Sequence, residues 1–295
     1  MNLREALELC QSKLKNHQNP AKEAYSLLQA CLGFKHVQEV RQLSPEFELS
    51  NKQVSKLLNF TERRSNHEPM AYIRGWEEFW GLKIKTSPAV LIPRPETEFL
   101  VENCLKRFPE IESRFSKQPG SLNILDLCCG SGAISAALHQ ELNVHKGFKT
   151  DHREVHIFAS EISYSALLIA RDNLDLASIS LTRASFLSAF RNESFHLIVS
   201  NPPYVPTNDL NTLEKDVSDF EPHLALFSGT DGMDSYRTLM PEIKRCLKSG
   251  GLALLECGIQ QAPQIKDLWS DLGEDCLESV FDFGGVERIV CLSKT

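Results

Sequence analysis

Residues 200–204, Ser-Asn-Pro-Pro-Tyr, combine an amide side chain, two prolines and a tyrosine directly after an apolar run at residues 195–199. The Asn201 side-chain oxygen and the Pro202 carbonyl could each accept one N–H of an NH₂ group, while Tyr204 packs on the flat group. These acceptors would align a planar nitrogen with a methyl donor and draw its lone pair out of conjugation. Asn-Pro and Pro-Pro also form turns, but the position after a predicted core strand favours methylation of such a nitrogen.

A second motif, Asp-Leu-Cys-Cys-Gly-Ser-Gly at residues 126–132, follows another apolar run and precedes a helical pattern. Open α/β sheets bind ligands at the carboxyl ends of their strands, where small residues let a ligand approach a helix N-terminus. The next predicted strand ends at Glu161, which could bond both hydroxyls of a ribose. Glycine-rich turns have purely structural reasons in about half of cases. A nicotinamide cofactor is a further interpretation, although Gly130-x-Gly132-x-x-Ser135 matches its pattern incompletely.

Strand-like and helix-like patterns alternate from about residue 120 onward. Strands are expected at residues 122–127, 155–159, 179–182, 195–199 and 252–255, and helices at residues 132–142, 163–175, 233–248 and 259–270. This alternation predicts a parallel sheet covered by helices on both faces. Residues 276–283 and 286–292 flank a glycine pair, which predicts an antiparallel hairpin at the end of the sheet.

Residues 1–75 show only helical patterns. Asn19 and Pro20 predict a helix start, Gly33 a helix end, and Ser50 precedes a further helix. His67-Glu68-Pro69 is the expected exit from this helical bundle. Residues 76–119 connect the two parts, and the two prolines in residues 91–98, Leu-Ile-Pro-Arg-Pro-Glu-Thr-Glu, predict a fixed loop before a helix that starts near Glu98.

Composition narrows the class of protein. The 295 residues are 42% hydrophobic and carry a net charge of −7, enough for one large or two modest domains. No apolar run approaches the roughly 18 residues of a membrane span, and the charged start is unlike a signal peptide, so a soluble cytoplasmic protein is expected. The nine cysteines include no Cys-x-x-Cys pair, which predicts free thiols. His145, His152 and His156 lie in a polar insertion without ligand spacing, so no metal site is expected.

The charge is unevenly distributed. Residues 1–75 hold 11 basic and 8 acidic side chains, a net charge of +3, whereas residues 76–295 carry −10. An acidic balance disfavours a large nucleic-acid surface, because phosphates are bound mostly by Lys and Arg. We therefore expect the basic module to dock an acidic surface of a protein partner through residues such as Arg63 and Arg64.

Over nearly its whole length the chain resembles the release factor glutamine methyltransferases, the HemK/PrmC family. The resemblance is carried by residues 68–75, 79–82, 91–98, 126–132, 201–204 and 221–226, by Gly229 and Asp231-Gly232, and by Glu256-Cys257-Gly258 with Gln260. Arg-Pro-Glu-Thr-Glu with a helical domain in front is far more specific than Asn-Pro-Pro-Tyr, which enzymes acting on nucleic-acid bases share.

The resemblance implies a fold and a domain organisation. The fold is a class I methyltransferase, an α/β protein with a doubly wound, mostly parallel, seven-stranded Rossmann-like sheet behind a small N-terminal helical bundle. Residues 1–75 would be the substrate-recognition domain, residues 76–119 a linker with a β-hairpin and a helix, and residues 120–295 the methyltransferase domain.

The resemblance also implies an activity: methyl transfer from S-adenosylmethionine to the side-chain amide of the glutamine in the Gly-Gly-Gln loop of peptide chain release factors. A monomer is expected, because no heptad run in the sequence requires a larger assembly. The implied catalytic residues are Asn201, Pro202 and Tyr204, which with Pro203 also bind the substrate amide. The implied cofactor-binding residues are Asp126, Cys128, Cys129, Gly130, Ser131, Gly132, Glu161, Phe186 and Asn201. For Asp126 an indirect role, bonding loop amides, is favoured over contact with the methionine end of the cofactor.

Two departures from the family pattern stand out. The cofactor loop usually begins Gly-Thr-Gly, but here Cys128-Cys129-Gly130 places a side chain where close backbone approach is wanted. The usual Asp-Trp near the adenine is Ser185-Phe186, which keeps an aromatic face and loses a carboxylate. Both predict altered cofactor affinity with unchanged chemistry.

Two other classes of function remain open at this stage. A nucleic-acid amino-methyltransferase uses the same Asn-Pro-Pro-Tyr clamp on adenine or guanine, but usually adds a basic groove or a larger recognition domain. A non-catalytic nucleotide-binding or scaffold protein would not need the intact clamp. Arg94, Glu96 and Glu98 could shape a substrate groove or cap the following helix, and Glu221-Pro222 is expected to order a loop rather than touch substrate.

Overall fold

The computed structural model of the protein describes residues 1–144, 154–274, 276–282 and 284–295. The chain forms two units. The first comprises Met1–Trp76 together with Glu214–Phe220, and the second comprises Glu77–Leu213 together with Glu221–Thr295. His145, His152 and Phe283, which entered the predictions, lie outside the described residues. No helix among the described residues is long and apolar enough to cross a membrane.

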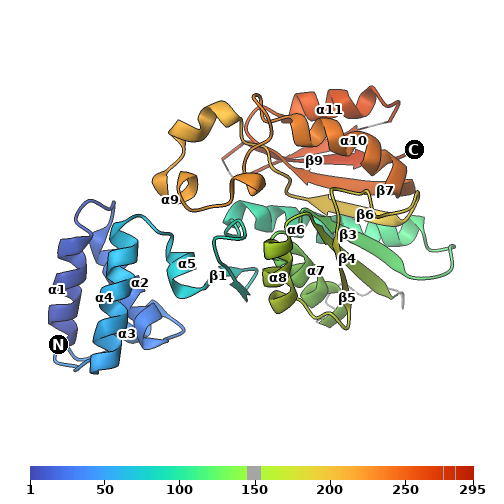
Figure 1. The fold of residues 1–295 in the computed structure, drawn as a ribbon. Helices are drawn as coiled ribbons and strands as arrows, with labels where there is room; N and C mark the ends of the chain where they lie inside the picture. Colours follow the sequence, from blue (N-terminus) through green and yellow to red (C-terminus); the bar gives the residue numbers. More distant parts are fainter. Residues whose placement is uncertain (145–153, 275, 283) are drawn as a thin grey trace. The chain divides into compact units, whose positions relative to one another are not determined.

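The first unit is helical (Figure 1). Its helices are α1 (Leu3–Lys13), α2 (Pro20–Leu32), α3 (Val37–Arg41), α4 (Asn51–Ser65), α5 (Met70–Arg74) and the short α9 (Lys215–Ser218). The start of α2 is confirmed, because the Asn19 side chain accepts the N–H of Lys22 and Pro20 is the first helical residue. Gly33 ends this helix with a φ of 76°. The predicted exit at residues 67–69 is wrong, since α5 follows it.

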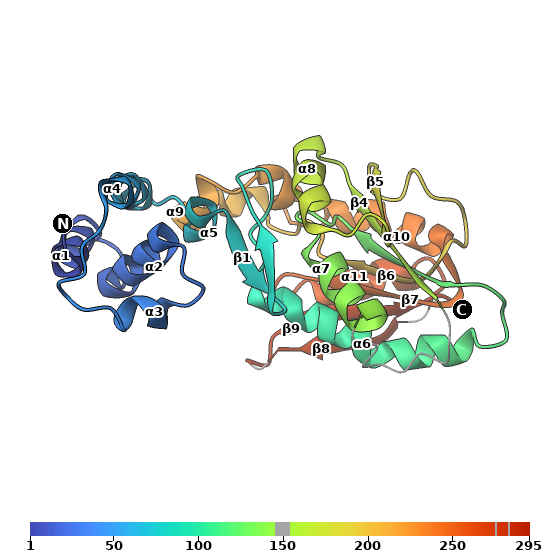
Figure 2. The same ribbon diagram turned by 90° about the horizontal axis from the view of Figure 1, so that it is seen from below.

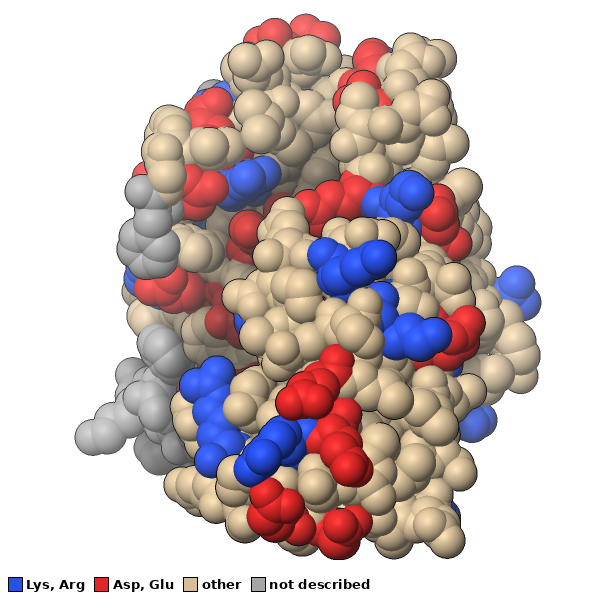
Figure 3. Space-filling view, turned by 90° about the vertical axis from the view of Figure 1, so that its left-hand side faces the viewer, with Lys and Arg blue, Asp and Glu red and all other residues tan. Residues whose placement is uncertain are grey.

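The arginines predicted to dock a partner are paired inside this unit. Arg63 donates two hydrogen bonds to the carboxylate of Glu68, at 2.8 and 2.5 Å. The Arg64 side chain is only 9% exposed and donates to both Glu23 and Asp216. On the face drawn in Figure 3, acidic side chains lie among the basic ones. Both guanidinium groups are thus held by carboxylates of their own unit, and the docking of an acidic partner by this unit stays a prediction.

The second unit contains a seven-stranded sheet in the order β5-β4-β3-β6-β7-β9-β8. Its strands are β3 (Leu122–Leu127), β4 (Val155–Glu161), β5 (Ile179–Arg183), β6 (Phe195–Ser200), β7 (Leu247–Glu256), β8 (Cys276–Phe281) and β9 (Glu287–Ser293). All pairs are parallel except those of β9, which runs antiparallel to both β7 and β8. The predicted sheet and its terminal hairpin are confirmed.

Helices cover both faces of the sheet (Figures 1 and 2). On one face lie α6 (Pro95–Arg114), α7 (Ala133–His139) and α8 (Tyr164–Asn173), and on the other α10 (Asp234–Cys246) and α11 (Ala262–Ser270). Strand β3 contributes to the hydrophobic cores on both faces of the sheet. Ile124 packs into the core beneath α6, α7 and α8, and its neighbour Leu125 packs into the core beneath α10 and α11. The expected α/β fold, doubly wound around a mostly parallel sheet, is thus present.

Residues 76–119 contain the expected hairpin and helix, but from Glu77 onward they belong to the second unit and not to a separate linker. Strands β1 (Trp76–Phe79) and β2 (Leu82–Lys85) form a two-stranded sheet, and α6 follows. The helix begins at Pro95 rather than near Glu98, since proline is favoured at the first helical position, where no N–H is needed. Helix α7 ends at His139 and continues as a π-helical turn over Gln140–Val144.

Candidate active site

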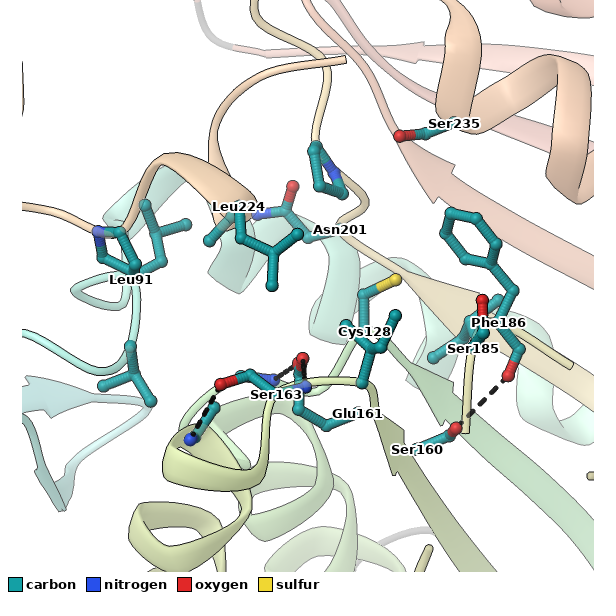
Figure 4. A pocket seen from close by; sticks show the side chains of 18 of the residues that line it. Leu91, Cys128, Ser160, Glu161, Ser163, Ser185, Phe186, Asn201, Leu224 and Ser235 are labelled. Atoms are coloured by element: carbon teal, nitrogen blue, oxygen red, sulfur yellow. Dashed lines mark hydrogen bonds between the residues drawn. The ribbon is translucent and has the colours of Figure 1, made fainter. Parts of the chain in front are cut away.

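A cavity of about 310 Å³ lies at the carboxyl ends of β3, β4, β5 and β6. Its volume is at the lower end of the range of about 300–1,000 Å³ for small-molecule sites. Figure 4 shows Cys128 between Asn201 and Glu161, with Leu91 and Phe186 toward opposite sides of the view. The place is the one expected for a ligand in an open α/β sheet.

The structure places only part of the predicted cofactor set on the cavity wall. The predicted residues that line the cavity are Cys128, Gly130, Glu161, Phe186 and Asn201. Those that are not among the described lining residues are Asp126, Cys129, Ser131 and Gly132. All four are buried: Cys129, Ser131 and Gly132 belong to the loop that connects β3 to α7, and Asp126 lies in β3 beneath it.

Positive φ angles explain the composition of this loop. Cys128 has a φ of 60°, Gly130 of 54° and Gly132 of 80°. Glycine adopts this region at no steric cost, whereas a residue with a Cβ atom is strained there. A Cβ atom on Gly132 would also lie 3.0 Å from the side chain of Leu174. Cys128 therefore carries strain, and its side chain occupies the cavity wall.

Glu161 ties the loop to the end of β4. Its Oε2 accepts the backbone N–H of Gly130 at 3.0 Å, and its Oε1 accepts that of Ser163 at 2.9 Å. Each carboxylate oxygen has a further lone pair. Glu161 can thus hold the loop and still accept hydroxyl groups of a bound ribose from the cavity.

Asp126 is fully buried beneath the same loop. Its Oδ2 accepts both the N–H of Ser135, at 2.9 Å, and the hydroxyl of Ser135, at 2.6 Å. Burial raises the pKa of the Asp126 carboxyl to about 7, and Oδ1 has no partner in the described part of the chain. This geometry agrees with the indirect role favoured for Asp126, since its contacts are with the start of α7.

Asn201 is held by a side chain far away in the sequence. Its Nδ2 donates to Oγ1 of Thr97 at 3.0 Å, which leaves the amide oxygen for a ligand. The Thr97 hydroxyl in turn bonds to the buried carboxyl of Glu256, which also accepts the hydroxyl of Tyr204 at 3.3 Å. Burial raises the pKa of Glu256 to about 7 and raises the pKa of Tyr204.

Of the remaining residues of the Asn-Pro-Pro-Tyr motif, one lines the cavity and two lie behind its wall. Pro203 lines the cavity, whereas Pro202 is buried and is not among the described lining residues. The Tyr204 ring packs against the core between the sheet and α10 and is likewise not on the described wall. Its backbone oxygen accepts the Gln261 side chain at 2.9 Å.

Pro222, which was predicted only to order the loop after β6, lines the cavity, whereas Glu221 does order that loop. Its carboxylate accepts the backbone N–H of Ile92 at 3.1 Å and pairs with Arg94. Glu98 accepts the backbone N–H of Trp80 at 2.7 Å. Arg94 and Glu98 therefore fasten loops through specific partners.

Three supporting residues were not predicted from the sequence: Thr97, Glu256 and Gln261. Glu256 offered a usable signal, because it is an acidic residue at the end of a predicted strand. The family pattern pointed to Gln260, but the side chain that holds Gly258 and Tyr204 is that of Gln261.

Comparisons with known proteins agree with this geometry. Residues 5–75 match the family model of the PrmC N-terminal domain, and residues 111–217 match that of the methyltransferase small domain. Release factor glutamine methyltransferases are similar over most of the chain. The one from Caulobacter vibrioides is 37% identical and covers 92% of this chain and 88% of its own. The one from Buchnera aphidicola subsp. Schizaphis graminum is 35% identical and covers 98% of each chain.

A solved methyltransferase structure from Pyrococcus furiosus aligns at 16% identity with a TM-score of 0.48, over 83% of this chain and 98% of its own. The sequence relatives reach far higher identity, and they cover the helical unit as well as the sheet. The chain belongs to the release factor glutamine methyltransferase family.

Proposed function

We propose that this protein transfers a methyl group from S-adenosylmethionine to the side-chain amide nitrogen of the glutamine in the Gly-Gly-Gln loop of peptide chain release factors. The observation that carries the proposal is the Asn201 amide, bonded through its nitrogen to Thr97 and placed on the cavity wall. Family membership supplies the substrate class.

The residues on the wall suit the cofactor. Glu161, Phe186, Cys128 and Gly130 all line the cavity. There Glu161 would offer carboxylate oxygens to the ribose hydroxyls, Phe186 an aromatic face to the adenine, and the loop at Cys128 and Gly130 a surface for the methionine end. Cys129, Ser131 and Gly132 are buried residues of that loop, and Asp126 lies beneath it. When bound, S-adenosylmethionine supplies a methyl group on a positively charged sulfur.

The protein supplies orientation and hydrogen-bond acceptors. The Asn201 oxygen and the Pro202 carbonyl accept the two N–H groups of the glutamine amide and reduce conjugation of its lone pair, while Pro203 and Tyr204 shape the site around them. The nitrogen forms a bond to the methyl carbon as the bond from carbon to sulfur breaks, and the nitrogen then loses one proton to water. Alignment and placed acceptors account for the acceleration.

We assign release-factor recognition to residues 1–75 and catalysis to residues 120–295, to which the hairpin and helix of residues 76–119 are joined in one unit that begins at Glu77. The match of residues 5–75 to a PrmC N-terminal domain supports this assignment. We further propose that the protein acts as a cytoplasmic monomer and that nucleic acid is not its substrate.

A transfer assay with tritium-labelled cofactor tests the activity, with release factor, tRNA and DNA offered separately. We expect label only in the release factor, and mass spectrometry should place it on the Gly-Gly-Gln glutamine. Label in tRNA or DNA alone would replace this proposal by base methylation.

Asn201→Ala tests the amide clamp. We expect turnover to fall at least about 100-fold, because an acceptor aimed at the reacting group is lost, while calorimetry shows unchanged cofactor affinity. Asn192→Ala is the matched control, since Asn192 contacts Arg245 outside this cavity. Normal turnover by the Asn201 variant would refute the clamp.

A further inference from the structure

A chain of side-chain hydrogen bonds runs from the cavity wall into the protein core. Asn201 follows β6, Thr97 lies in the first turn of α6, and Glu256 ends β7. The Asn201 nitrogen donates to the Thr97 oxygen at 3.0 Å, and the Thr97 hydroxyl bonds to the Glu256 carboxyl. One carboxyl thereby joins three elements that meet only in the folded chain.

The inner members of this chain do not reach the cavity themselves. Thr97 is 5% exposed and Glu256 is 3% exposed, and neither is among the described lining residues. A direct contact with substrate or cofactor is therefore not their role. Their only route to the reaction is through Asn201 and Tyr204, which they hold.

Stability alone does not explain a carboxyl at this place. Oε2 of Glu256 is buried without a hydrogen-bond partner in the described part of the chain. Burying a polar group that lacks a partner costs free energy, and a charged one costs more. An apolar side chain of similar size would avoid that cost. The carboxyl at this position is therefore explained by the hydrogen bonds that it accepts from Thr97 and Tyr204.

In this chain of hydrogen bonds, the donor and the acceptor of each bond are fixed. The Thr97 hydroxyl is the donor to Glu256, because its hydrogen bond counters the rise in pKa that burial causes, as only a bond donated to the carboxylate does. The lone pairs of the Thr97 oxygen are then left to accept, and the group they accept is the NH₂ end of the Asn201 amide. The carbonyl end of that amide is thereby presented to the substrate. With the amide reversed, Asn201 would offer N–H groups to an incoming N–H donor.

We propose that Thr97 and Glu256 are positioning residues that fix the direction of the Asn201 amide, so that its oxygen rather than its nitrogen receives the substrate amide. This inference rests on the proposed function, because it explains how the clamp acquires its acceptor. The same carboxyl also fixes Tyr204, whose hydroxyl donates to Oε1 at 3.3 Å.

Thr97→Val tests the inference, because valine keeps the shape of threonine and removes the hydroxyl. We expect kcat for the release factor to fall about 10- to 100-fold with a smaller change in KM, since substrate alignment rather than cofactor binding is lost. Cofactor affinity should stay within about twofold by calorimetry. Thr97→Ser, which restores the hydroxyl, should recover most of the activity.

Thr61→Val is the matched control. Thr61 is also buried, in the core of the helical unit, and its hydroxyl donates to the Leu57 carbonyl at 2.8 Å. Its loss should leave kcat unchanged. If Thr97→Val and Thr61→Val have equal kcat, or if Thr97→Ser is as slow as Thr97→Val, the positioning role is overturned.

A measurement without turnover separates this inference from the proposed function. Solvent exchange of the Asn201 side-chain NH₂ protons, followed by NMR in the ¹⁵N-labelled full chain, should accelerate about tenfold in Thr97→Val and in Glu256→Leu, but not in Thr97→Ser. Unchanged exchange overturns the positioning role whatever the activity. If exchange is faster in the Thr97→Val and Glu256→Leu variants but the wild-type protein does not methylate release factor, the positioning role stands and the proposed substrate is overturned.

Discussion

At the scale of single residues, Cys128 is the most unusual part of the cofactor loop. A side chain at a φ of 60° costs about 1 kcal/mol relative to glycine. Burial raises the pKa of this thiol, so it stays protonated and is a poor nucleophile. The cysteine is therefore a small neutral side chain on the cavity wall rather than a reactive group.

Cys128→Gly should strengthen cofactor binding by about 3- to 10-fold, because it removes both the strain and a side chain that keeps the ligand from the backbone. Ser185→Asp should do the same by restoring a carboxylate to the wall. Calorimetry with S-adenosylmethionine checks both, with the buried Cys246→Ala as the control. Wild-type affinity in both variants would contradict the inferred effect of these departures.

Asp126 predicts a pH dependence of stability. Burial raises the pKa of its carboxyl in the folded chain to about 7, above its usual value of 3.8. The folded state therefore takes up a proton between these values, and the contribution to stability is full below about pH 4 and lost as the pH rises through 7. Glu256 contributes in the same direction, since burial raises its pKa to about 7 as well.

Urea unfolding at several pH values checks this dependence. We expect the free energy of unfolding attributable to Asp126 to decrease from pH 5 to pH 8, and Asp126→Asn, which cannot ionise, to flatten the decrease by about 1 kcal/mol or more. The exposed Asp172→Asn serves as the control. An Asp126→Asn profile parallel to that of the wild type would show that Asp126 is ionised in the folded chain at every pH tested.

At the scale of elements, the first turn of α6 organises much of the site. Residues 91–98 supply Arg94 to Glu221, Thr97 to Asn201, and Glu98 to the backbone of Trp80. The helix thus connects the loop before it, the motif after β6 and the hairpin of β1 and β2. This explains why one short proline-rich segment carries so much of the family resemblance.

Arg94→Ala should destabilise the second unit by about 2 kcal/mol, because the Glu221 side chain is 1% exposed and would lose its salt bridge to Arg94. Urea unfolding followed by fluorescence measures the effect. Lys106→Ala is the control, because its pair with Glu102 is largely exposed and such pairs contribute little. Equal midpoints for the two variants would mean that Glu221 is held by its other contacts alone.

Strands, helices and the place of the cavity were predictable, because each rests on local patterns: apolar runs, caps and glycines at strand ends. The link from Asn201 to Thr97 spans 104 residues, and the link from Tyr204 to Glu256 spans 52. No local pattern specifies which side chains meet across three elements. The pairing of Arg64 with Asp216, 152 residues apart, escaped prediction for the same reason.

At the scale of the whole molecule, the chain passes between the two units more than once. Residues Glu214–Phe220 belong to the helical unit, yet they lie between the Asn-Pro-Pro-Tyr motif and Glu221, which belong to the other unit. Asp216 anchors this segment through Arg64, at 2.6 Å, and through His67, at 3.5 Å. Residues Glu214–Phe220 are thereby fixed within the helical unit.

Arg64→Leu should release this segment, because Asp216 would lose a hydrogen bond between charged groups that contributes about 1.5–3 kcal/mol. Amide hydrogen exchange in Lys215–Ser218 should accelerate at least about tenfold, and KM for the release factor should rise while the cofactor affinity stays unchanged. Arg4→Leu is the matched control, since Arg4 pairs with Glu46 on the surface of the same unit and is 62% exposed. Faster exchange with an unchanged KM would show that the anchored loop and factor binding are independent; unchanged exchange would show that Asp216 is not the anchor.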